Sequence, residues 1–372
     1  MTRTIVGLDI GSTGIRAAEF EIGRRTTSLR RFASVELPEE AIRSGTVADH
    51  EAVAVALREL WSRGKFSTKT VVLGIANEGV LVRQMDLEWM EPGDFRKGLR
   101  YQVADALPVP VDEANLDYYM LDEIEQPAEG QQEARRVARV MLVAAGREMV
   151  DGFVRSVQTA GLRPVRVDLL PFALVRAVSP VTEVDPALEA VVDIGAETVV
   201  VVVHRGGRPQ FVRTLSGHGG RAITRALMDR YEWTWEDAER TKIVLGLPGH
   251  SRLDAVPAAE SSSEETSVSV ADHPAHQVIV EQVDALVTEL RATLTYYRSS
   301  AEGSQPLSRI VLTGRAAGLG GLAETLREQL DVPVERLSVF DRVRKPRNMV
   351  LVQDQEAELA VPAGLCLGAM AS

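Results

Sequence analysis

The sequence predicts an α/β protein made of two similar lobes, and three observations support this prediction. Two aspartate-glycine turns, Asp9-Ile10-Gly11 and Asp193-Ile194-Gly195, lie half a chain apart in a sequence of 372 residues. Each turn follows an apolar run and precedes a β-rich run, which is typical of a strand, a tight glycine turn and a returning strand. The second half of the chain then repeats the opening plan of strands followed by helices. We therefore expect a duplicated fold.

The first lobe is predicted to contain residues 1–37 and 147–185. Its strands are expected at Thr4–Ile10, Ile15–Phe20 and about Leu29–Leu37. After a long interruption, a helix at Arg147–Ala160 returns the chain to this lobe, with Gly161 as its C-terminal stop.

Residues 38–146 are predicted to form an inserted α/β subdomain. Its expected elements are a helix that ends near Trp61 and Gly64, strands at Thr70–Ile75 and Val80–Met85, a helix from Pro92 to about Leu107, and strands at Asp117–Glu123 and Arg136–Ala145. We expect these elements to pack into one compact unit.

The second lobe is predicted to combine a core, residues 186–215 and 306–372, with a helical subdomain, residues 216–305. Its expected strands are Ala190–Ile194, Thr198–His204, Pro209–Leu215 and Arg309–Thr313, and its expected helices are Gly220–Tyr231, Thr234–Leu245 and His276–Ser299. Residues from about 248 to 275 are rich in Ser, Glu, Ala and Pro, which predicts a flexible surface loop.

Composition narrows the class of protein. A net charge of −11 argues against nucleic-acid binding and against a strongly electrostatic membrane partner. The single cysteine, Cys366, excludes an intramolecular disulfide and suits a reducing compartment. The chain begins with a predicted strand in place of a secretion signal, and no apolar run reaches the ~20 residues that span a bilayer. We therefore expect a cytoplasmic protein.

The two aspartate-glycine turns also predict chemistry. A tight glycine turn exposes backbone N–H groups that can cradle phosphate oxygens, and its aspartate can hold Mg²⁺ or a water on Mg²⁺. Asp9 and Asp193 are therefore the predicted metal-binding and catalytic residues. Taken singly, each could be an ordinary turn or capping aspartate, but the presence of two copies favours a phosphate site between two lobes.

Further segments along the chain carry a resemblance to one protein family. These segments are Gly7–Thr13, Leu107–Val111 with Leu116–Tyr118, Ala160–Leu162 with Val167-Asp168, Phe172–Leu174, Asp193–Ala196, Gly219-Gly220 with Ile223-Thr224, Ala238-Glu239 with Lys242, and Tyr296-Tyr297. On these residues the chain resembles the PilM family of type IV pilus assembly proteins. That family is related to FtsA and belongs to the superfamily of actin, Hsp70 and the sugar kinases.

The resemblance implies an actin-like ATPase fold of two ribonuclease-H-like lobes, with ATP and Mg²⁺ in the cleft and an inserted subdomain of the PilM and FtsA type. It also implies a partner, the N-terminal cytoplasmic tail of a PilN-like inner-membrane protein, bound in a groove beside the inserted subdomain. Through that partner the chain would lie at the inner face of the cytoplasmic membrane and would link the pilus machinery to its motor ATPases.

The resemblance also assigns nucleotide contacts residue by residue. The β- and γ-phosphates are expected at a first turn of Gly11, Ser12, Thr13 and Gly14, with Arg16 beyond it, and at a second turn of Gly195, Ala196 and Thr198. Gly219 and Gly220 open a predicted helix whose free N–H groups could meet phosphate. Glu239 and Lys242, at positions i and i+3 of a helix, are expected near the ribose. The alternative for this pair is a surface ion pair that contributes ~0.3 kcal/mol.

The predicted adenosine turn departs from the family pattern. Gly314, Arg315 and Ala316 are expected to contact the base, and Arg315 takes a position that relatives usually give to glycine. Its planar guanidinium could stack on adenine, or it could crowd the pocket. Because the other site residues are present, we expect ATP binding to be retained.

A second departure concerns hydrolysis. After Val167-Asp168, relatives often place Gln or Glu to orient the attacking water, whereas this chain has Leu169-Leu170-Pro171. Leucine can neither accept a proton nor position a water. We therefore expect ATP to be hydrolysed slowly or not at all.

Three alternative functions stay open at this point. FtsA-like cell-division proteins usually end in an amphipathic membrane-targeting helix, and the lack of a basic face in Leu365–Ser372 favours PilM instead. A nucleotide-free adaptor would follow if Arg315 closed the pocket. A small-molecule kinase would need a catalytic aspartate facing a substrate hydroxyl, and no motif of the chain supplies one.

Overall fold

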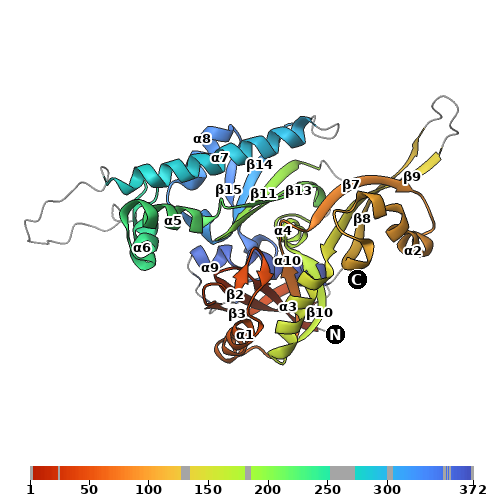
Figure 1. Cartoon of the computed structure of the whole chain (residues 1–372), viewed down its shortest axis with the longest axis horizontal. Helices are drawn as coiled ribbons and strands as arrows, with labels where there is room; N and C mark the ends of the chain where they lie inside the picture. Colours follow the sequence, from red (N-terminus) through yellow and green to blue (C-terminus); the bar gives the residue numbers. More distant parts are fainter. Residues whose placement is uncertain are drawn as a thin grey trace, which may run out of the picture.

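The computed structural model describes residues 3–23, 26–126, 135–180, 186–251, 273–299, 305–346, 349, 351 and 353–369. Within this part, the chain folds into two lobes, each built on a five-stranded sheet, and a smaller three-stranded sheet projects from one side (Figure 1).

The first sheet has the strand order β10-β6-β1-β2-β3. Its strands are β1 (Arg3–Ile10), β2 (Gly14–Ile22), β3 (Thr27–Glu36), β6 (Thr70–Ile75) and β10 (Arg163–Leu169). The first three strands form an antiparallel meander, and β6 and β10 then extend the sheet in parallel. Since Ile10 lies opposite Ile15, the residues between them form the tight turn that the sequence predicts.

The boundary predicted for the inserted subdomain is wrong at its start. Helix α1 (His50–Gly64) packs against the first sheet, and β6 pairs with β1, so both belong to the first lobe rather than to an insertion that begins at residue 38. The physical reason lies in β6, whose residues after Thr70 are all buried. A strand buried on both faces is typical of the middle of a parallel sheet. Two short strands, β4 (Ile42–Arg43) and β5 (Thr46–Val47), precede α1.

The projecting subdomain is therefore smaller than predicted. It consists of β7 (Leu81–Glu88), α2 (Pro92–Gln102), β8 (Ala114–Gln126) and β9 (Arg135–Gly146), with two short helical turns, η1 (Ala104–Ala106) and η2 (Val111–Glu113). The strand order is β7-β9-β8, and α2 covers the sheet through Phe95 and Leu99. Helix α3 (Arg147–Thr159) then returns the chain to the first lobe, as predicted.

The second sheet repeats the plan of the first, with the order β13-β12-β11-β14-β15. Its strands are β11 (Leu188–Ile194), β12 (Thr198–Arg205), β13 (Arg208–Ser216), β14 (Arg309–Thr313) and β15 (Val334–Arg336). Again a three-stranded antiparallel meander is extended by two parallel strands. Asp9 and Asp193 occupy the same place in the two sheets, one residue before the end of the first strand.

Two helices lie between the large sheets (Figure 1). Each of them contacts the sheet of the other lobe, not only the sheet that it follows in the chain. Helix α4 (Leu170–Val178) follows the first sheet but also packs on β12 of the second. Helix α10 (Ala360–Gly368) follows the second sheet but packs on β1, although we predicted residues 306–372 in the core of the second lobe. Both helices share one apolar core with side chains from both sheets, so the lobes are joined by packing.

The helical part of the second lobe contains α5 (Gly220–Tyr231), α6 (Trp235–Leu245), α7 (Ala275–Ser299) and α8 (Leu322–Leu330). Smaller elements are η5 (Arg315–Gly318), η6 (Val339–Asp341) and α9 (Gln353–Ala357). Thr234 caps α6 by accepting a hydrogen bond from the Asp237 N–H. Of the predicted flexible loop, residues 252–272 lie outside the described part of the chain. None of the described helices is long and apolar enough to cross a membrane.

Candidate nucleotide site between the lobes

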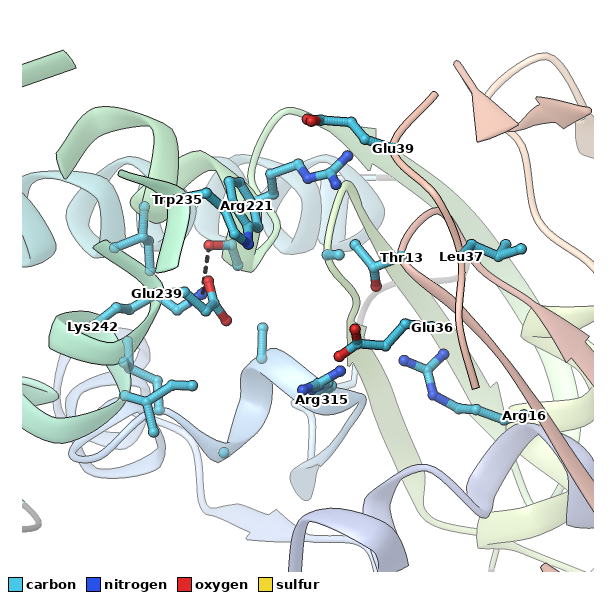
Figure 2. Close-up of a pocket in the computed structure, with 17 residues that line it drawn as sticks. Thr13, Arg16, Glu36, Leu37, Glu39, Arg221, Trp235, Glu239, Lys242 and Arg315 are labelled. Atoms are coloured by element: carbon cyan, nitrogen blue, oxygen red, sulfur yellow. Dashed lines mark hydrogen bonds and ion pairs between the residues drawn. The ribbon is translucent and has the colours of Figure 1, made fainter. Parts of the chain in front are cut away.

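The cleft between the lobes holds two neighbouring cavities. The larger has a volume of about 360 Å³ and the smaller about 70 Å³. Both are lined by Thr13 and Arg16 of the first lobe and by Ala196 and Arg315 of the second. Figure 2 shows the larger cavity, with α6 on one side and the first lobe on the other.

The smaller cavity brings the two predicted phosphate turns together. Its wall contains residues of the first turn, residues of the second turn and both predicted aspartates: Asp9, Gly11, Ser12, Thr13, Asp193, Gly195, Ala196, Glu197 and Thr198. Each turn is closed by one backbone bond, from the Gly11 N–H to the Gly14 carbonyl (3.0 Å) and from the Gly195 N–H to the Thr198 carbonyl (2.9 Å). Converging turns of this kind can surround an anion.

Gly14 has a different place from the one predicted. It is buried at the start of β2, where a Cβ would lie 2.6 Å from the Val35 carbonyl oxygen. Gly14 therefore allows β2 and β3 to approach closely, and its carbonyl closes the turn.

In the smaller cavity, Arg16 forms ion pairs with two carboxylates. Its Nη1 lies 3.2 Å from Asp9 Oδ2, and its Nε lies 3.4 Å from Glu358 Oε1. Burial raises the pKa of Asp9, and Arg16 opposes that effect. The pKa of Asp193 is raised to about 7, first by removal from water and then by the negative charge of Asp9. Carboxylates in this environment favour a nearby cation.

Glu358 is a site residue that sequence reasoning missed. It lies between α9 and α10, its side chain is 10% exposed, and it lines the smaller cavity together with the phosphate turns. In the sequence it is one of several carboxylates in the segment Asp354–Glu358 and has no glycine turn beside it. Only the return of α10 to the first sheet brings it to the cleft.

The smaller cavity fits Mg²⁺ held through water. Its wall includes the carboxylates of Asp9, Asp193 and Glu358, and carboxylate oxygen is a ligand type that Mg²⁺ prefers. Mg²⁺ also usually keeps several of its own waters. Within the described residues, no three acidic, histidine or cysteine side chains converge closely enough to hold a metal directly. Asp9 and Asp193 would therefore bind the ion mainly through its water shell.

Glu239 and Lys242 of α6 both line the larger cavity (Figure 2). Lys242 is 8% exposed, and its Nζ donates to Glu239 Oε2 at 2.6 Å, to Thr224 Oγ1 at 2.9 Å and to the Gly220 carbonyl at 3.1 Å. Burial lowers the pKa of Lys242, and Glu239 opposes that effect. A buried network of this kind differs from the surface ion pair that was the alternative prediction.

The Gly220 N–H, one of the donors predicted to meet phosphate, is used within the protein. The Gly220 N–H donates to the Gly195 carbonyl and the Arg221 N–H to the Ala196 carbonyl, both at 2.9 Å. At Gly219 a Cβ would lie 2.3 Å from the Ala196 carbonyl oxygen. These glycines therefore fasten α5 to the second phosphate turn, because the carbonyls of that turn take the first donors of the helix.

Arg315 reaches both cavities from the adenosine turn. Gly314 before it has φ of 88° and packs against Ile194, where a Cβ would lie 2.5 Å from the carbonyl oxygen, so only glycine fits there. Arg315 is exposed at the cavity wall, opposite Glu36 of the first lobe (Figure 2). The larger cavity keeps its volume of about 360 Å³ with the arginine in place.

Two further residues of the cavity were not selected from the sequence. The Arg221 guanidinium lies 5.0 Å from the ring centroid of Trp235, and its Nη1 is 2.8 Å from Glu197 Oε1. Both Arg221 and Trp235 line the larger cavity. The dipeptides around them carry no distinctive spacing, so only the packing of α5 on α6 shows their place.

Leu170 is placed as its sequence position suggested. It is the first residue of α4 and lines the smaller cavity together with Asp193. The nearby carboxylate of Asp168 is paired with Arg176, whose Nη2 donates to Asp168 Oδ2 at 2.5 Å. This part of the wall therefore offers an apolar side chain.

The two lobes, the shared core and the cleft define an actin-like ATPase fold, and comparisons with known proteins agree. The fold is similar to ethanolamine utilization protein EutJ from Carboxydothermus hydrogenoformans (TM-score 0.55, 15% identity, 98% of this chain and 89% of that chain). It is also similar to MreB5 of Spiroplasma citri bound to ADP (TM-score 0.52, 12% identity, 99% and 97% of the chains).

The particular family follows from a sequence match. The chain belongs to the type IV pilus assembly protein PilM family, whose sequence model matches residues 7–370. It is similar to the structure of a PilM-PilN type IV pilus biogenesis complex, with a TM-score of 0.80 and 26% identity over 98% of each chain. It is also 25% identical to the cell division protein FtsA of Neisseria meningitidis serogroup B, over 93% of this chain and 87% of that protein. The predicted fold and family are confirmed.

Proposed function

We propose that this chain is an ATP-binding scaffold of type IV pilus assembly, which holds Mg²⁺–ATP in the cleft and a PilN-like partner beside the inserted subdomain. The observation that carries the nucleotide half is the convergence of two glycine turns and two aspartates on one small cavity. Family membership carries the pilus half.

The residues of the cleft fit the parts of a nucleotide. Ser12, Thr13 and the second turn would surround the phosphates, and Arg16 would add positive charge next to them. Bound Mg²⁺ would neutralise phosphate charge. The larger cavity, next to the phosphate turns, offers room for sugar and base between Glu239 and Arg315. Related folds have been solved with nucleotides, including MreB5 with ADP and with AMPPNP.

We propose that hydrolysis is slow or absent. Leu170 stands at the cavity wall and Asp168 is paired with Arg176, so neither can orient a water for attack on the terminal phosphate. ATP would then act as a ligand that joins the two lobes. Robust steady-state ATPase activity of the purified protein, lost in Asp9→Ala, would contradict this part of the proposal.

The partner half of the proposal is the binding of the N-terminal tail of a PilN-like inner-membrane protein, with a further link to the pilus motor ATPases. Its support is the similarity to a PilM-PilN complex along 98% of the chain, which includes the projecting subdomain. That partner would bring this chain to the inner face of the cytoplasmic membrane.

Fluorescence anisotropy with a labelled tail peptide tests the partner half. We expect saturable binding of the tail peptide of the PilN-like protein and no binding of a scrambled peptide of the same composition. Adding saturating Mg²⁺–ATP shows whether the partner distinguishes the nucleotide-loaded state. Equal behaviour of the tail and scrambled peptides would reject the partner.

A further inference from the structure

A side-chain bond joins the second lobe to the base of the projecting subdomain. The Ser216 hydroxyl, at the end of β13, donates to Glu78 Oε2 at 2.6 Å. Glu78 follows β6 of the first sheet and precedes β7 of the projecting subdomain, so it stands where the chain passes from one to the other. Both residues are exposed and lie outside the walls of the two cavities, so the bond is separate from the proposed nucleotide contacts.

On the Glu78 side, the bond is fixed to the first lobe through Asn77. The Asn77 side chain donates from Nδ2 to the Ser44 carbonyl at 2.8 Å and accepts from the Gly79 N–H at 2.6 Å. The Val80 N–H closes the same turn by donating to the Asn77 carbonyl at 3.1 Å. Asn77 is also buried. Because an asparagine that bonds its own turn in this way holds the backbone in one conformation, Glu78 is presented at a defined point.

On the Ser216 side, the bond is fixed to the second phosphate turn. Ser216 lies opposite Thr198 where β13 pairs with β12. The next residue, Gly217, donates its N–H to the Glu197 carbonyl at 3.1 Å. Thr198 and Glu197 both line the smaller cavity. A group bound in that cavity is therefore separated from Ser216 by a single step across the sheet.

The projecting subdomain also meets the second lobe through its first strand. β13 contacts β7, which begins at Leu81, three residues after Glu78 (Figure 1). Both chain connections of the subdomain, from β6 and to α3, run to the first lobe. The subdomain is thus attached to one lobe by the chain and to the other by side-chain contacts. Its orientation therefore depends on how the two lobes lie relative to each other.

We propose that the bond between Ser216 and Glu78 couples the nucleotide in the cleft to the orientation of the projecting subdomain, so that Mg²⁺–ATP strengthens the binding of the partner tail. The inference rests on the proposed function and adds a regulation to it. Mg²⁺–ATP held by both phosphate turns fixes the second lobe, and Ser216 with it, relative to the first. The bond then holds the base of the subdomain, and the tail meets a surface that is already oriented.

The direction of the coupling follows from the arrangement in which the bond is formed. In that arrangement the chain is similar along its length to the structure of a PilM-PilN complex, so we expect it to be the arrangement that binds the tail. A ligand shifts a protein toward the arrangement that it binds better. Mg²⁺–ATP and the tail should therefore strengthen each other, and thermodynamic linkage requires the two effects to be the same factor.

Fluorescence anisotropy of a labelled tail peptide, with and without saturating Mg²⁺–ATP, measures this coupling. In the wild type we expect the nucleotide to lower the dissociation constant of the peptide about fivefold, the lower end for coupled sites, because one exposed hydrogen bond carries the effect. In Ser216→Ala the ratio should fall below about twofold. Ser216→Thr keeps the hydroxyl and should keep the ratio. Ser299→Ala, at the exposed end of α7, is the matched control and should behave as the wild type does.

A second variant tests the other partner of the bond. Glu78→Ala removes the acceptor and should lose the ratio as Ser216→Ala does. The double variant should lose no more than either single variant, because both changes break the same bond. Titration calorimetry gives the reciprocal measurement, in which saturating peptide should strengthen Mg²⁺–ATP binding to the wild type by the same factor.

The outcomes separate this inference from the proposed function. If both ligands bind the wild type but Mg²⁺–ATP does not strengthen the peptide, or if Ser216→Ala keeps the wild-type ratio, the inference is wrong. If Ser216→Ala weakens the peptide equally with and without nucleotide, the bond has only a structural role and the inference is wrong as well. If the wild type binds no ATP or no tail peptide, the proposed function fails and the inference falls with it.

Discussion

At the scale of single residues, the smaller cavity brings carboxylates from distant parts of the chain together near Arg16. Arg16 stands between Asp9 of the first lobe and Glu358 of the segment that follows the second. The pKa values of Asp9 and Asp193 are raised chiefly because these groups are removed from water. A cavity with more carboxylates than guanidinium groups in its wall is stabilised by additional positive charge, which Mg²⁺ would supply.

Arg315 provides a prediction about the base site. If its guanidinium stacks on the base, Arg315→Ala should weaken Mg²⁺–ATP about three- to tenfold, in line with the strength of such contacts. Arg155→Ala, at an exposed position of α3, is the control and should leave the affinity unchanged. Binding that becomes tighter in Arg315→Ala would mean that the arginine obstructs the pocket.

His204 provides a prediction about pH. It is fully buried on β12, facing Glu189 and Arg309, and burial lowers its pKa to about 4. Because the folded pKa lies below the ordinary value of about 6.5, the unfolded chain binds a proton first as the pH falls. Stability should therefore fall from pH 6.5 to pH 4, by about 3 kcal/mol for this group.

Urea unfolding of the wild type and of His204→Gln at several pH values measures this effect. The variant should be less stable at neutral pH but should lose less stability between pH 6.5 and pH 4. Parallel pH curves for the two proteins would show that another group causes the acid loss.

The candidate site was predictable from the sequence only where a residue has a local signature. Asp9 and Asp193 could be found because each is followed by a glycine turn after an apolar strand. Glu358, Arg221 and Trp235 could not, since their place depends on contacts between segments far apart in the chain. The buried hydrogen-bond network of Lys242 likewise includes Thr224, which belongs to another helix.

At the scale of elements, α10 packs closely on α4 and on β1. At Gly364 an added Cβ would lie 1.8 Å from the Ala173 carbonyl oxygen of α4. We expect Gly364→Ala to force the two helices apart and to destabilise the protein by roughly 1–3 kcal/mol or more. Gly93→Ala, where a Cβ would meet nothing within 4 Å, is the control. Equal stability of both variants in thermal unfolding would contradict the packing described.

The ranges of the helices and strands were predicted better than the contacts between them. The strands and helices of both lobes follow from apolar runs and turn residues, and most lie close to their predicted ranges. Sequence periodicity does not state which strand pairs with which, so β6 was assigned to the insertion although it pairs with β1. Helix α10 was likewise assigned to the lobe that precedes it in sequence, whereas it packs on the first sheet.

At the scale of the whole molecule, the lobes are joined by the shared core and by side-chain bonds between them. Arg16 pairs with Glu358, and the Ser216 hydroxyl donates to Glu78 at 2.6 Å. A nucleotide held by both phosphate turns would add contacts to each lobe at once. At a concentration 100 times its dissociation constant, such a ligand stabilises the folded state by about 2.7 kcal/mol, so Mg²⁺–ATP should raise the unfolding temperature.

Titration calorimetry with Mg²⁺–ATP tests the central claim, that two aspartate-glycine turns form one nucleotide site, most directly. The proteins to compare are the wild type, Asp193→Ala, and Asp151→Ala as a control on the exposed face of α3. We predict saturable binding by the wild type and the control and none by Asp193→Ala. Undiminished binding by Asp193→Ala, or no binding by the wild type, would contradict the account.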